Sequence, residues 1–333
     1  MKHNFKITLV LLLMFVVTQF IGLYVIHSDP FHIRTEVNGT TQIISNPSLS
    51  WIEPPEVKEE SDFGIYLGSI IFAFIFAIVL LFLLIRFKID VILRVWFFIV
   101  VIIALSLSLT AIFPEFIYKI NPIIYFIIPI AIAIPLAFIK IFRRNFIVHN
   151  ITELLIYPGI AAVFVPILNL WSIIILLLII SVYDIWAVWH SGIMQRMAKY
   201  QINKLKVFSG FFVPYLSKKV RLQLNKMKKS RLKKKKIKVN IAILGGGDVV
   251  FPLITSGVMF SLKSKFPEGV PFLPQFGFHN IPVGIGPAIF VIAGATLGLA
   301  LLFAFSEKKK FYPAMPFITA GIFLGLILSY LIF

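Results

Sequence analysis

Residues 181–189 read SVYDIWAVW, and residues 241–251 read IAILGGGDVVF. Each stretch sets one aspartate, Asp184 or Asp248, inside a long apolar run. A carboxylate at bilayer depth costs about 2.5–3.5 kcal/mol on insertion scales, so an acid in such a run is a candidate functional residue. The other acidic residues, Glu153 among them, are assigned to a polar stretch, to loops or to the ends of apolar runs. The sequence therefore predicts one pair of intramembrane acids.

The composition is that of a membrane protein. The 333 residues are 59% hydrophobic, with a mean hydropathy of +0.96, which is far above the soluble globular range. Cysteine is absent, which excludes disulfides, thiolate metal sites and a cysteine nucleophile. The six histidines form no ligand-spaced cluster, and aspartates without nearby His or Glu make a poor metal site. We therefore predict neither a metal ion nor another cofactor.

Apolar runs long enough to cross a bilayer, about 20 residues each, recur along the whole chain. We predict an all-α polytopic membrane protein with nine transmembrane helices. The predicted spans are 5–26, 63–85, 91–113, 122–142, 151–168, 171–189, 239–260, 283–305 and 313–333. The fifth and sixth spans form one nearly continuous run, which Pro166 and Asn169 are expected to break.

The first span has an alternative interpretation as a signal peptide, because Lys2 and Lys6 flank an apolar run. That run is longer than the apolar core of a usual signal peptide, and no small-x-small cleavage site follows it. We therefore expect a retained first span.

Basic residues mark one side of the predicted membrane. The short loops and ends on this side hold Lys2 and Lys6, Arg86 and Lys88, Lys140, Arg143 and Arg144, and Lys308 to Lys310. The opposite side holds an acidic stretch at residues 27–62. By the positive-inside rule the N-terminus is cytoplasmic, and nine spans across the cell membrane put the C-terminus outside. The chain is then divided into spans one to six within residues 1–192, a cytoplasmic loop at 193–238, and spans seven to nine within 239–333.

The loop at residues 193–238 carries 16 of the 32 basic residues and no acidic residue. Such a stretch can bind nucleic acid, but here it lies between two spans beside anionic lipid, which attracts each basic residue by about 1 kcal/mol. We therefore expect a topological role and lipid contact, and no nucleic-acid partner. The aromatic cluster within this loop is expected to form a surface helix; its members are Phe208, Phe211, Phe212 and Tyr215.

Asp184 and Asp248 are expected to face each other. Their spans run in opposite directions on either side of the basic loop, and a rise of 1.5 Å per residue puts both at a depth of roughly 10–18 Å from the cytoplasmic boundary. Two carboxylates a few ångströms apart share a proton near neutral pH, because both cannot ionise cheaply. The neutral acid can then protonate a carbonyl oxygen while the carboxylate activates water, which is aspartic-protease chemistry.

Two further elements fall on the cytoplasmic half of the predicted helices. Gly245, Gly246 and Gly247 precede Asp248, so a peptide backbone can approach closely; tight helix packing through small residues is the alternative. Residues 312–316, Tyr-Pro-Ala-Met-Pro, open the last span, and two prolines leave backbone carbonyls unpaired. Exposed backbone at this depth is tolerated where it lines a wet cavity. A helix that simply begins at a proline is the alternative.

Together these elements resemble the presenilin family of intramembrane aspartyl proteases, which includes signal peptide peptidase. The family pattern of YD, GxGD and PAL in the sixth, seventh and ninth spans corresponds here to Tyr183-Asp184, Gly245-Gly246-Gly247-Asp248 and Pro313-Ala314-Met315. The order, the host spans and the number of spans all match. Met315 replaces the leucine of PAL, which is a near-isosteric change. Gly246 stands where presenilins usually carry a bulkier apolar residue, which is expected to alter substrate preference.

The resemblance implies a role for each of these residues. Asp184 and Asp248 would form the catalytic dyad, while the residues that shape the active site and contact substrate would be Tyr183, Leu244, Gly245, Gly246, Gly247, Pro313, Ala314 and Met315. Substrates would be single-span membrane proteins whose helix unwinds locally. An extended substrate would add as a strand to backbone near Leu244 or the last span.

The basic loop between the sixth and seventh spans also separates two branches of the family. Signal peptide peptidases resemble an inverted presenilin, with this loop outside. Here the loop is the most basic segment of the chain, which matches presenilin and its microbial homologues and puts the active site toward the cytoplasm. The sequence leaves accessory subunits and a homo-oligomer open.

Three other classes of protein compete with this interpretation. Prepilin-type peptidases also carry GxGD, but here the other acid lies in YD within a span and the proline-alanine element comes last. A proton- or cation-conducting channel or transporter also uses buried acids. Transporters often have broken helices in both halves, whereas the Gly-rich and Pro-rich breaks here lie in the C-terminal half. A structural scaffold leaves both buried acids unexplained.

Overall fold

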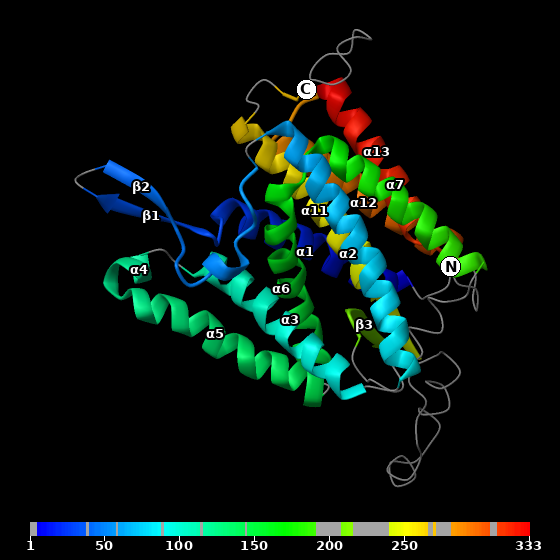
Figure 1. Cartoon of the computed structure of the whole chain (residues 1–333). Coiled ribbons are helices and arrows are strands. Elements are labelled where there is room, and N and C mark those ends of the chain that lie inside the picture. Colours follow the sequence, from blue (N-terminus) through cyan, green and yellow to red (C-terminus); the bar gives the residue numbers. More distant parts are fainter. Residues whose placement is uncertain are drawn as a thin grey trace.

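The computed structural model describes residues 5–37, 40–57, 59–87, 90–113, 116–143, 145–190, 208–215, 240–265, 269–270, 281–306 and 312–333. Within these residues the chain is a bundle of helices with two small two-stranded sheets (Figure 1). Most of the basic loop predicted at residues 193–238 lies outside the described residues, and so do Lys308 to Lys310.

The long helices follow the predicted apolar runs. They are α1 (Phe5–Ser28), α2 (Glu60–Arg86), α3 (Asp90–Ile112), α5 (Pro122–Phe138), α6 (Phe146–Phe164), α7 (Leu170–Ile185), α11 (Gly246–Lys265), α12 (Ile285–Phe305) and α13 (Met315–Ile332). A short helix, α4 (Phe116–Ile120), precedes α5, and π-helical turns follow α5 at Ile139–Arg143 and α7 at Trp186–His190.

Eight helices in the described part of the chain are long and apolar enough to cross a membrane. The helix α11 is not among them, because Asp248, its lysines and its small polar residues lower its hydropathy. It nevertheless packs inside the bundle against α1, α6 and α12, and it follows the predicted seventh span along the chain.

The predicted break between the fifth and sixth spans is confirmed. A 3-10 turn at Val165–Ile167 ends α6, and the side chain of Asn169 then caps α7. Its Oδ1 accepts a hydrogen bond from the Ser172 backbone N–H at 2.8 Å.

The start of α6 is earlier than predicted. The helix begins at Phe146 and not at residue 151, because Asn145 caps it there. The Asn145 side chain accepts hydrogen bonds from the backbone N–H groups of Ile147 at 2.9 Å and Val148 at 3.3 Å. The apolar residues 146–148, which the prediction leaves outside the span, thus form the first turn of α6.

Two segments for which a helix is predicted form strands. β3 (Gly210–Tyr215) pairs antiparallel with β4 (Asn240–Gly245). The prediction of helix is therefore wrong for the aromatic cluster and for the start of the 239–260 span. Residues 240–244 read NIAIL, in which β-branched side chains favour a strand, and each of the glycines that follow disfavours a helix by about 1 kcal/mol relative to alanine.

A second hairpin, which the sequence analysis does not predict, lies in the acidic stretch after α1. β1 (His32–Val37) pairs antiparallel with β2 (Thr40–Ser45), and a 3-10 turn follows at Ser50–Ile52. This hairpin projects away from the helices (Figure 1).

The helices α12 and α13 cross at backbone contact. A Cβ atom at Gly294 would lie 2.1 Å from the Gly321 carbonyl oxygen, and one at Gly321 would lie 2.1 Å from the Gly294 carbonyl oxygen. Small residues permit such close crossings in membranes. The close crossing therefore sets the position of α13 against α12.

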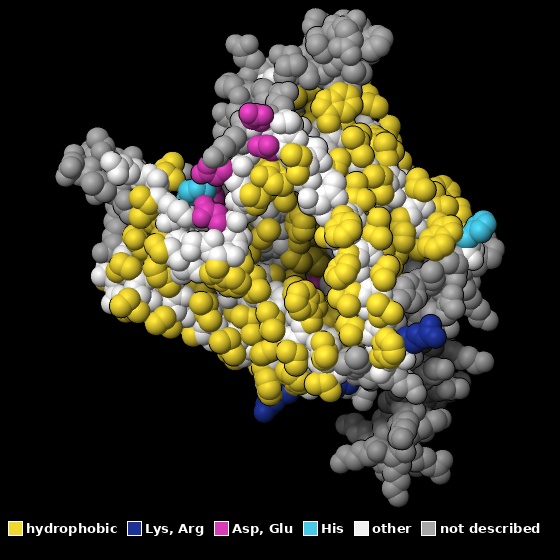
Figure 2. All heavy atoms as spheres, in the orientation of Figure 1, with side chains coloured by type: hydrophobic (Ala, Val, Ile, Leu, Met, Phe, Trp, Pro, Cys, Tyr) yellow, Lys and Arg dark blue, Asp and Glu magenta, His cyan; other side chains and the backbone are white. Residues whose placement is uncertain are grey.

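The outer surface of the bundle is largely hydrophobic (Figure 2). Large apolar side chains such as Phe72, Val91 and Leu331 are each 72% exposed. In the same view acidic side chains gather in the upper part and basic side chains lie along the lower edge. Such a surface is suited to lipid, with its charges at the two ends.

Candidate active site

Asp184 lies in the last turn of α7, and its side chain is buried, with 5% exposed. Its Oδ2 accepts a hydrogen bond from the backbone N–H of Met315 at 3.0 Å. Met315 is the first residue of α13, so the carboxylate lies at a helix N-terminus. Unpaired N–H groups and the helix dipole favour a negative charge at such a position.

The predicted Pro313-Ala314-Met315 element forms the N-terminus of α13. Ala314 is the N-cap residue, and Pro316 at the second helical position has no N–H to donate. The side chains of Pro313 and Met315 are buried, and the main chain makes the contact with Asp184. The helix that begins at the prolines is therefore observed, and its first backbone N–H meets an acid, whereas the unpaired carbonyls beside a wet cavity stay a prediction. A backbone contact does not depend on whether residue 315 is methionine or leucine.

Asp248 lies in the first turn of α11 and is half-buried. Its carboxylate is hydrogen-bonded to the backbone of Gly245, as the acid of a capping box bonds to the N–H of the N-cap residue. A Cβ atom at Gly245 would lie 3.1 Å from Asp248 Oδ2. Gly245 therefore leaves room for the carboxylate to fold back over the helix start.

The structure brings the two acids into one site. The helices α7 and α11 pack against each other, and the charge of Asp184 acts on Asp248. Figure 2 shows a hollow among hydrophobic side chains on the surface, with an acidic side chain visible inside it. Each acid is bonded at a helix N-terminus, Asp184 at that of α13 and Asp248 at that of α11.

Gly246 is buried under two hydroxyl groups. A Cβ atom there would lie 2.7 Å from Ser209 Oγ and 2.9 Å from Tyr157 Oη. Gly247 is exposed, and the nearest atom to its Cβ position lies 3.7 Å away on Phe251. Packing therefore requires glycine at residue 246 and not at residue 247. A bulkier residue at 246, which is usual in presenilins, has no room beside Tyr157.

Leu244 and Tyr183 each precede one of the acids along the chain. Leu244 is buried in β4 opposite Phe211. Tyr183 is half-buried, and its ring meets the ring of Phe74 on α2 edge-on, with 5.4 Å between centroids. Leu244 thus belongs to the buried face of the sheet, and Tyr183 links α7 to α2.

Two buried polar contacts beside the acids escape the sequence analysis. Gln19 on α1 donates from Nε2 to the Val249 carbonyl at 3.0 Å, one residue after Asp248. Ser181 on α7 and Thr319 on α13 share a hydrogen bond of 2.9 Å between their hydroxyl groups. Gln19 carries a usable signal, because a glutamine in the middle of an apolar span needs a buried partner.

The prediction that Glu153 lies at the end of an apolar run is wrong. It lies within α6, its side chain is fully buried, and it forms an ion pair with Lys140, which is 6% exposed. The prediction also counts Lys140 among the basic residues of the short loops and ends, although its fourth span, 122–142, includes this residue. The error follows from the early start of α6, because the cap at Asn145 adds helix before Glu153.

No group of three or more His, Cys, Asp and Glu side chains in the described part of the chain is placed to hold a metal ion. The nearest arrangement is the cluster of Glu153, His149 and Lys140. A lysine ammonium lies between the other two side chains, so this cluster already holds its cation.

The fold and the site define a multi-pass integral membrane protein with two acids held at helix starts inside the bundle. A family model described as "Signal-peptide peptidase, presenilin aspartyl protease" matches residues 43–333. The chain belongs to this family of intramembrane aspartyl proteases. Membership implies that transmembrane proteins are its substrates.

The chain also resembles solved structures along almost its whole length. One, described as a presenilin family intramembrane aspartate protease in space group C222, superposes with a TM-score of 0.53 at 16% identity and covers 97% of this chain and 98% of that chain. Another, in space group P2, gives 0.51 at 16% identity, over 96% and 95%. At this identity the likeness shows the fold. A search of curated proteins finds no match.

These findings confirm three predictions made from the sequence. The family is the predicted one, the fold is the predicted all-α presenilin-like membrane fold, and the class of enzyme is the predicted intramembrane aspartyl protease.

Proposed function

We propose that Asp184 and Asp248 are the catalytic dyad of this intramembrane endopeptidase. The observation that carries the proposal is the shared environment of the two side chains. Each carboxylate is hydrogen-bonded to the backbone at the start of a helix, and the negative charge of Asp184 acts electrostatically on Asp248. Within the described residues neither aspartate forms a salt bridge with a basic side chain. Two carboxylates so held titrate as one pair and share a proton.

The reaction follows from this shared proton. The ionised aspartate takes a proton from water as the water oxygen attacks the peptide carbonyl carbon, and the neutral aspartate gives its proton to the carbonyl oxygen. In the second step the C–N bond breaks as the aspartate that took the water proton gives it to the leaving amine, while a hydroxyl group on the tetrahedral carbon returns its proton to the other aspartate and the carboxyl product forms. Both aspartates end in their starting charge states, one neutral and one ionised.

The proposed substrates are single-span membrane proteins that present an extended segment to the dyad. The strand β4 ends at Gly245, three residues before Asp248, so a substrate strand paired with β4 would run toward the carboxylates. Gly245, Gly246 and Gly247 keep side chains away from that path. Leu244 and Tyr183, with Pro313-Ala314-Met315, would form the surrounding walls.

The proposed orientation puts the dyad toward the cytoplasmic side of the cell membrane. In the described part of the chain Lys6, Arg86 and Arg143 are exposed, and Figure 2 has basic side chains along one edge and acidic ones in the opposite part. The positive-inside rule makes the basic edge cytoplasmic. Anionic lipid would then lie beside the basic segment at 193–238.

The test is cleavage of a single-span reporter by purified protein, with Asp184→Asn and Asp248→Asn measured separately. Each change should lower cleavage by about 100- to 10,000-fold, because each removes one partner in the proton transfers. Cleavage that survives either substitution, in protein shown to be folded, would reject the dyad and implicate a contaminating protease.

A further inference from the structure

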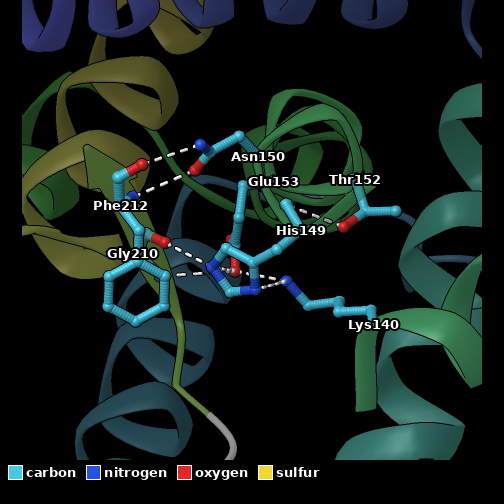
Figure 3. A network of polar contacts seen from close by, with 7 residues as sticks. All are labelled: Lys140, His149, Asn150, Thr152, Glu153, Gly210 and Phe212. Atoms are coloured by element: carbon cyan, nitrogen blue, oxygen red, sulfur yellow. Dashed lines mark hydrogen bonds and ion pairs between the residues drawn. The ribbon is translucent and has the colours of Figure 1, made fainter. Parts of the chain in front are cut away.

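The strand β3 is bound on both of its edges. One edge pairs with β4, and the other faces the first turns of α6. Figure 3 shows the side chains of Asn150, His149 and Glu153 from α6 directed at the backbone of Gly210 and Phe212. Helix side chains thus lie along the side of β3 where a further strand would otherwise lie.

Asn150 bonds to β3 as a neighbouring strand would. Its Nδ2 donates to the Phe212 carbonyl at 2.8 Å, and its Oδ1 accepts from the Phe212 backbone N–H at 3.0 Å. A residue in an adjacent antiparallel strand exchanges the same two bonds with its partner. The carboxamide therefore replaces one peptide unit of a third strand.

Gly210, two residues earlier and on the same edge, is held in the same manner by charged groups. Its backbone N–H donates to Glu153 Oε1 at 3.3 Å, and its carbonyl accepts from His149 Nε2 at 2.7 Å. All four peptide groups that Gly210 and Phe212 turn toward α6 are therefore bonded to its side chains.

Lys140 orients this cluster. Its ammonium forms the ion pair with Glu153 and lies 3.3 Å from His149 Nδ1. An ammonium can only donate, so His149 Nδ1 must accept, and the ring proton is then on Nε2. That proton is the one donated to the Gly210 carbonyl. The buried cation therefore selects the histidine tautomer that binds the strand.

The other edge of this sheet is different. Within the described residues, no hydrogen bond is found to the backbone groups of Ile241 and Ile243, which β4 turns away from β3, whereas the backbone of Gly245 at the end of the strand is bonded to Asp248. An unpaired strand edge accepts a further strand, whereas an edge whose groups are already bonded does not. In the described part of the chain the sheet thus has one blocked edge and one open edge.

The blocked edge is tied directly to the active site. The Gly246 backbone N–H donates to the carbonyl of Ser209 at 3.3 Å, so the residue before Gly210 holds the first residue of α11. Tyr157, one turn after Glu153 on α6, covers Gly246 with its hydroxyl. A shift of β3 along α6 would therefore move the helix start that carries Asp248.

We propose that His149, Asn150 and Glu153 are positioning residues, which close the β3 edge, leave β4 as the edge for the substrate strand, and fix its register relative to Asp248. The claim that these residues set the register of the substrate rests on the proposed dyad. The claim that they hold β3 against α6 does not. Slippage along a strand moves the peptide bond that meets the catalytic groups. A loosened anchor thus produces cleavage at several neighbouring bonds.

The test uses Asn150→Asp in the full-length protein. Aspartate keeps the oxygen that accepts from the Phe212 N–H. Its second oxygen replaces the Nδ2 donor, so the hydrogen bond to the Phe212 carbonyl is lost and the two oxygens repel each other. The matched control is Asn145→Asp at the N-cap of α6, because aspartate caps a helix as well as asparagine does and the exposed side chain of Asn145 bonds to the helix start. Two readouts are made: product termini by mass spectrometry, and amide exchange of residues 210–215 and 240–245 in the Asp248→Asn background.

Asn150→Asp should raise amide exchange in both strands by about tenfold, the effect of one lost hydrogen bond, and should split the product into neighbouring species. The control should do neither. A role in stability alone would reduce the amount of folded enzyme and leave the product termini unchanged, and that result would overturn the proposal. Amide exchange can be measured without catalysis. Cleavage by the Asp248→Asn variant would therefore reject the proposed dyad without affecting the test of the anchoring residues.

His149 supplies a second, independent pair of variants. His149→Gln retains a donor that can reach the Gly210 carbonyl, so it should keep the product termini of the unchanged protein. His149→Leu has no donor and should broaden them. Identical termini from both variants would overturn the role of this bond.

Discussion

Glu153 and the pair Asp184–Asp248 are all carboxylates inside the bundle, but the protein surrounds them differently. Glu153 is fully buried and has the Lys140 ammonium beside it, so its charge is neutralised. The two aspartates have no such cation within the described residues and rely on backbone N–H groups at helix starts. The difference separates a carboxylate that joins two helices from carboxylates that stay available for chemistry.

The largest effect that this comparison predicts is on activity without loss of stability. Asp184→Asn combined with Asp248→Asn should lower reporter cleavage by about 100- to 10,000-fold. The free energy of unfolding should stay the same or rise, because the ionised carboxylate of the pair no longer has to be held inside the bundle. Cleavage assays and denaturant titration in the same detergent measure both quantities. A double variant that unfolds readily would mean that the aspartates are structural after all.

The second prediction concerns the opposite region. Glu153→Ala leaves the Lys140 ammonium buried without its partner and should destabilise the protein by about 3–5 kcal/mol. The control is the double change Lys140→Met with Glu153→Leu, which removes both charges and should recover most of the loss. Thermal unfolding followed by tryptophan fluorescence distinguishes them. Equal stability of the single and double variants would contradict the ion pair.

The third prediction concerns Gly246, which lies where the two regions meet. Gly246→Ala places a methyl group 2.7 Å from Ser209 Oγ and 2.9 Å from Tyr157 Oη, and it should cost about 1–3 kcal/mol. Gly247→Ala is the matched control, because its methyl group meets nothing closer than 3.7 Å. Unfolding and cleavage are compared for the pair, and equal effects at both positions would refute the packing explanation.

The smallest expected effect is at Ser181. Its hydroxyl bond to Thr319 ties α7 to α13 one turn from Asp184, and hydrogen bonds between membrane helices average about 0.6 kcal/mol. Ser181→Ala should therefore lower the unfolding free energy by roughly that amount. A change above 2 kcal/mol, roughly the largest value measured for such bonds, would mean that the contact does more than join two helices.

The sequence predicts the helices well, because a run of about 20 apolar residues has few other solutions in a bilayer. It also predicts the two aspartates, since an acid in such a run is conspicuous. The strands β3 and β4 are missed because pairing is a long-range contact, with Phe211 and Leu244 separated by the basic loop. Glu153 is missed because a single cap, Asn145, shifts the start of α6. Which acid has a cation beside it is likewise a tertiary contact that sequence spacing does not reveal.

The hollow in the apolar surface has a kinetic consequence. If the proposed dyad lies in this hollow, transmembrane substrates reach it by diffusing within the plane of the lipid, and the concentration that governs the rate is the number of substrate molecules per lipid and not per litre. Adding lipid while the amounts of enzyme and substrate stay fixed dilutes the substrate in two dimensions and slows turnover, although nothing changes in the bulk volume. A Michaelis constant for this enzyme is therefore a mole fraction, and values from different lipid-to-protein ratios become comparable only on that scale.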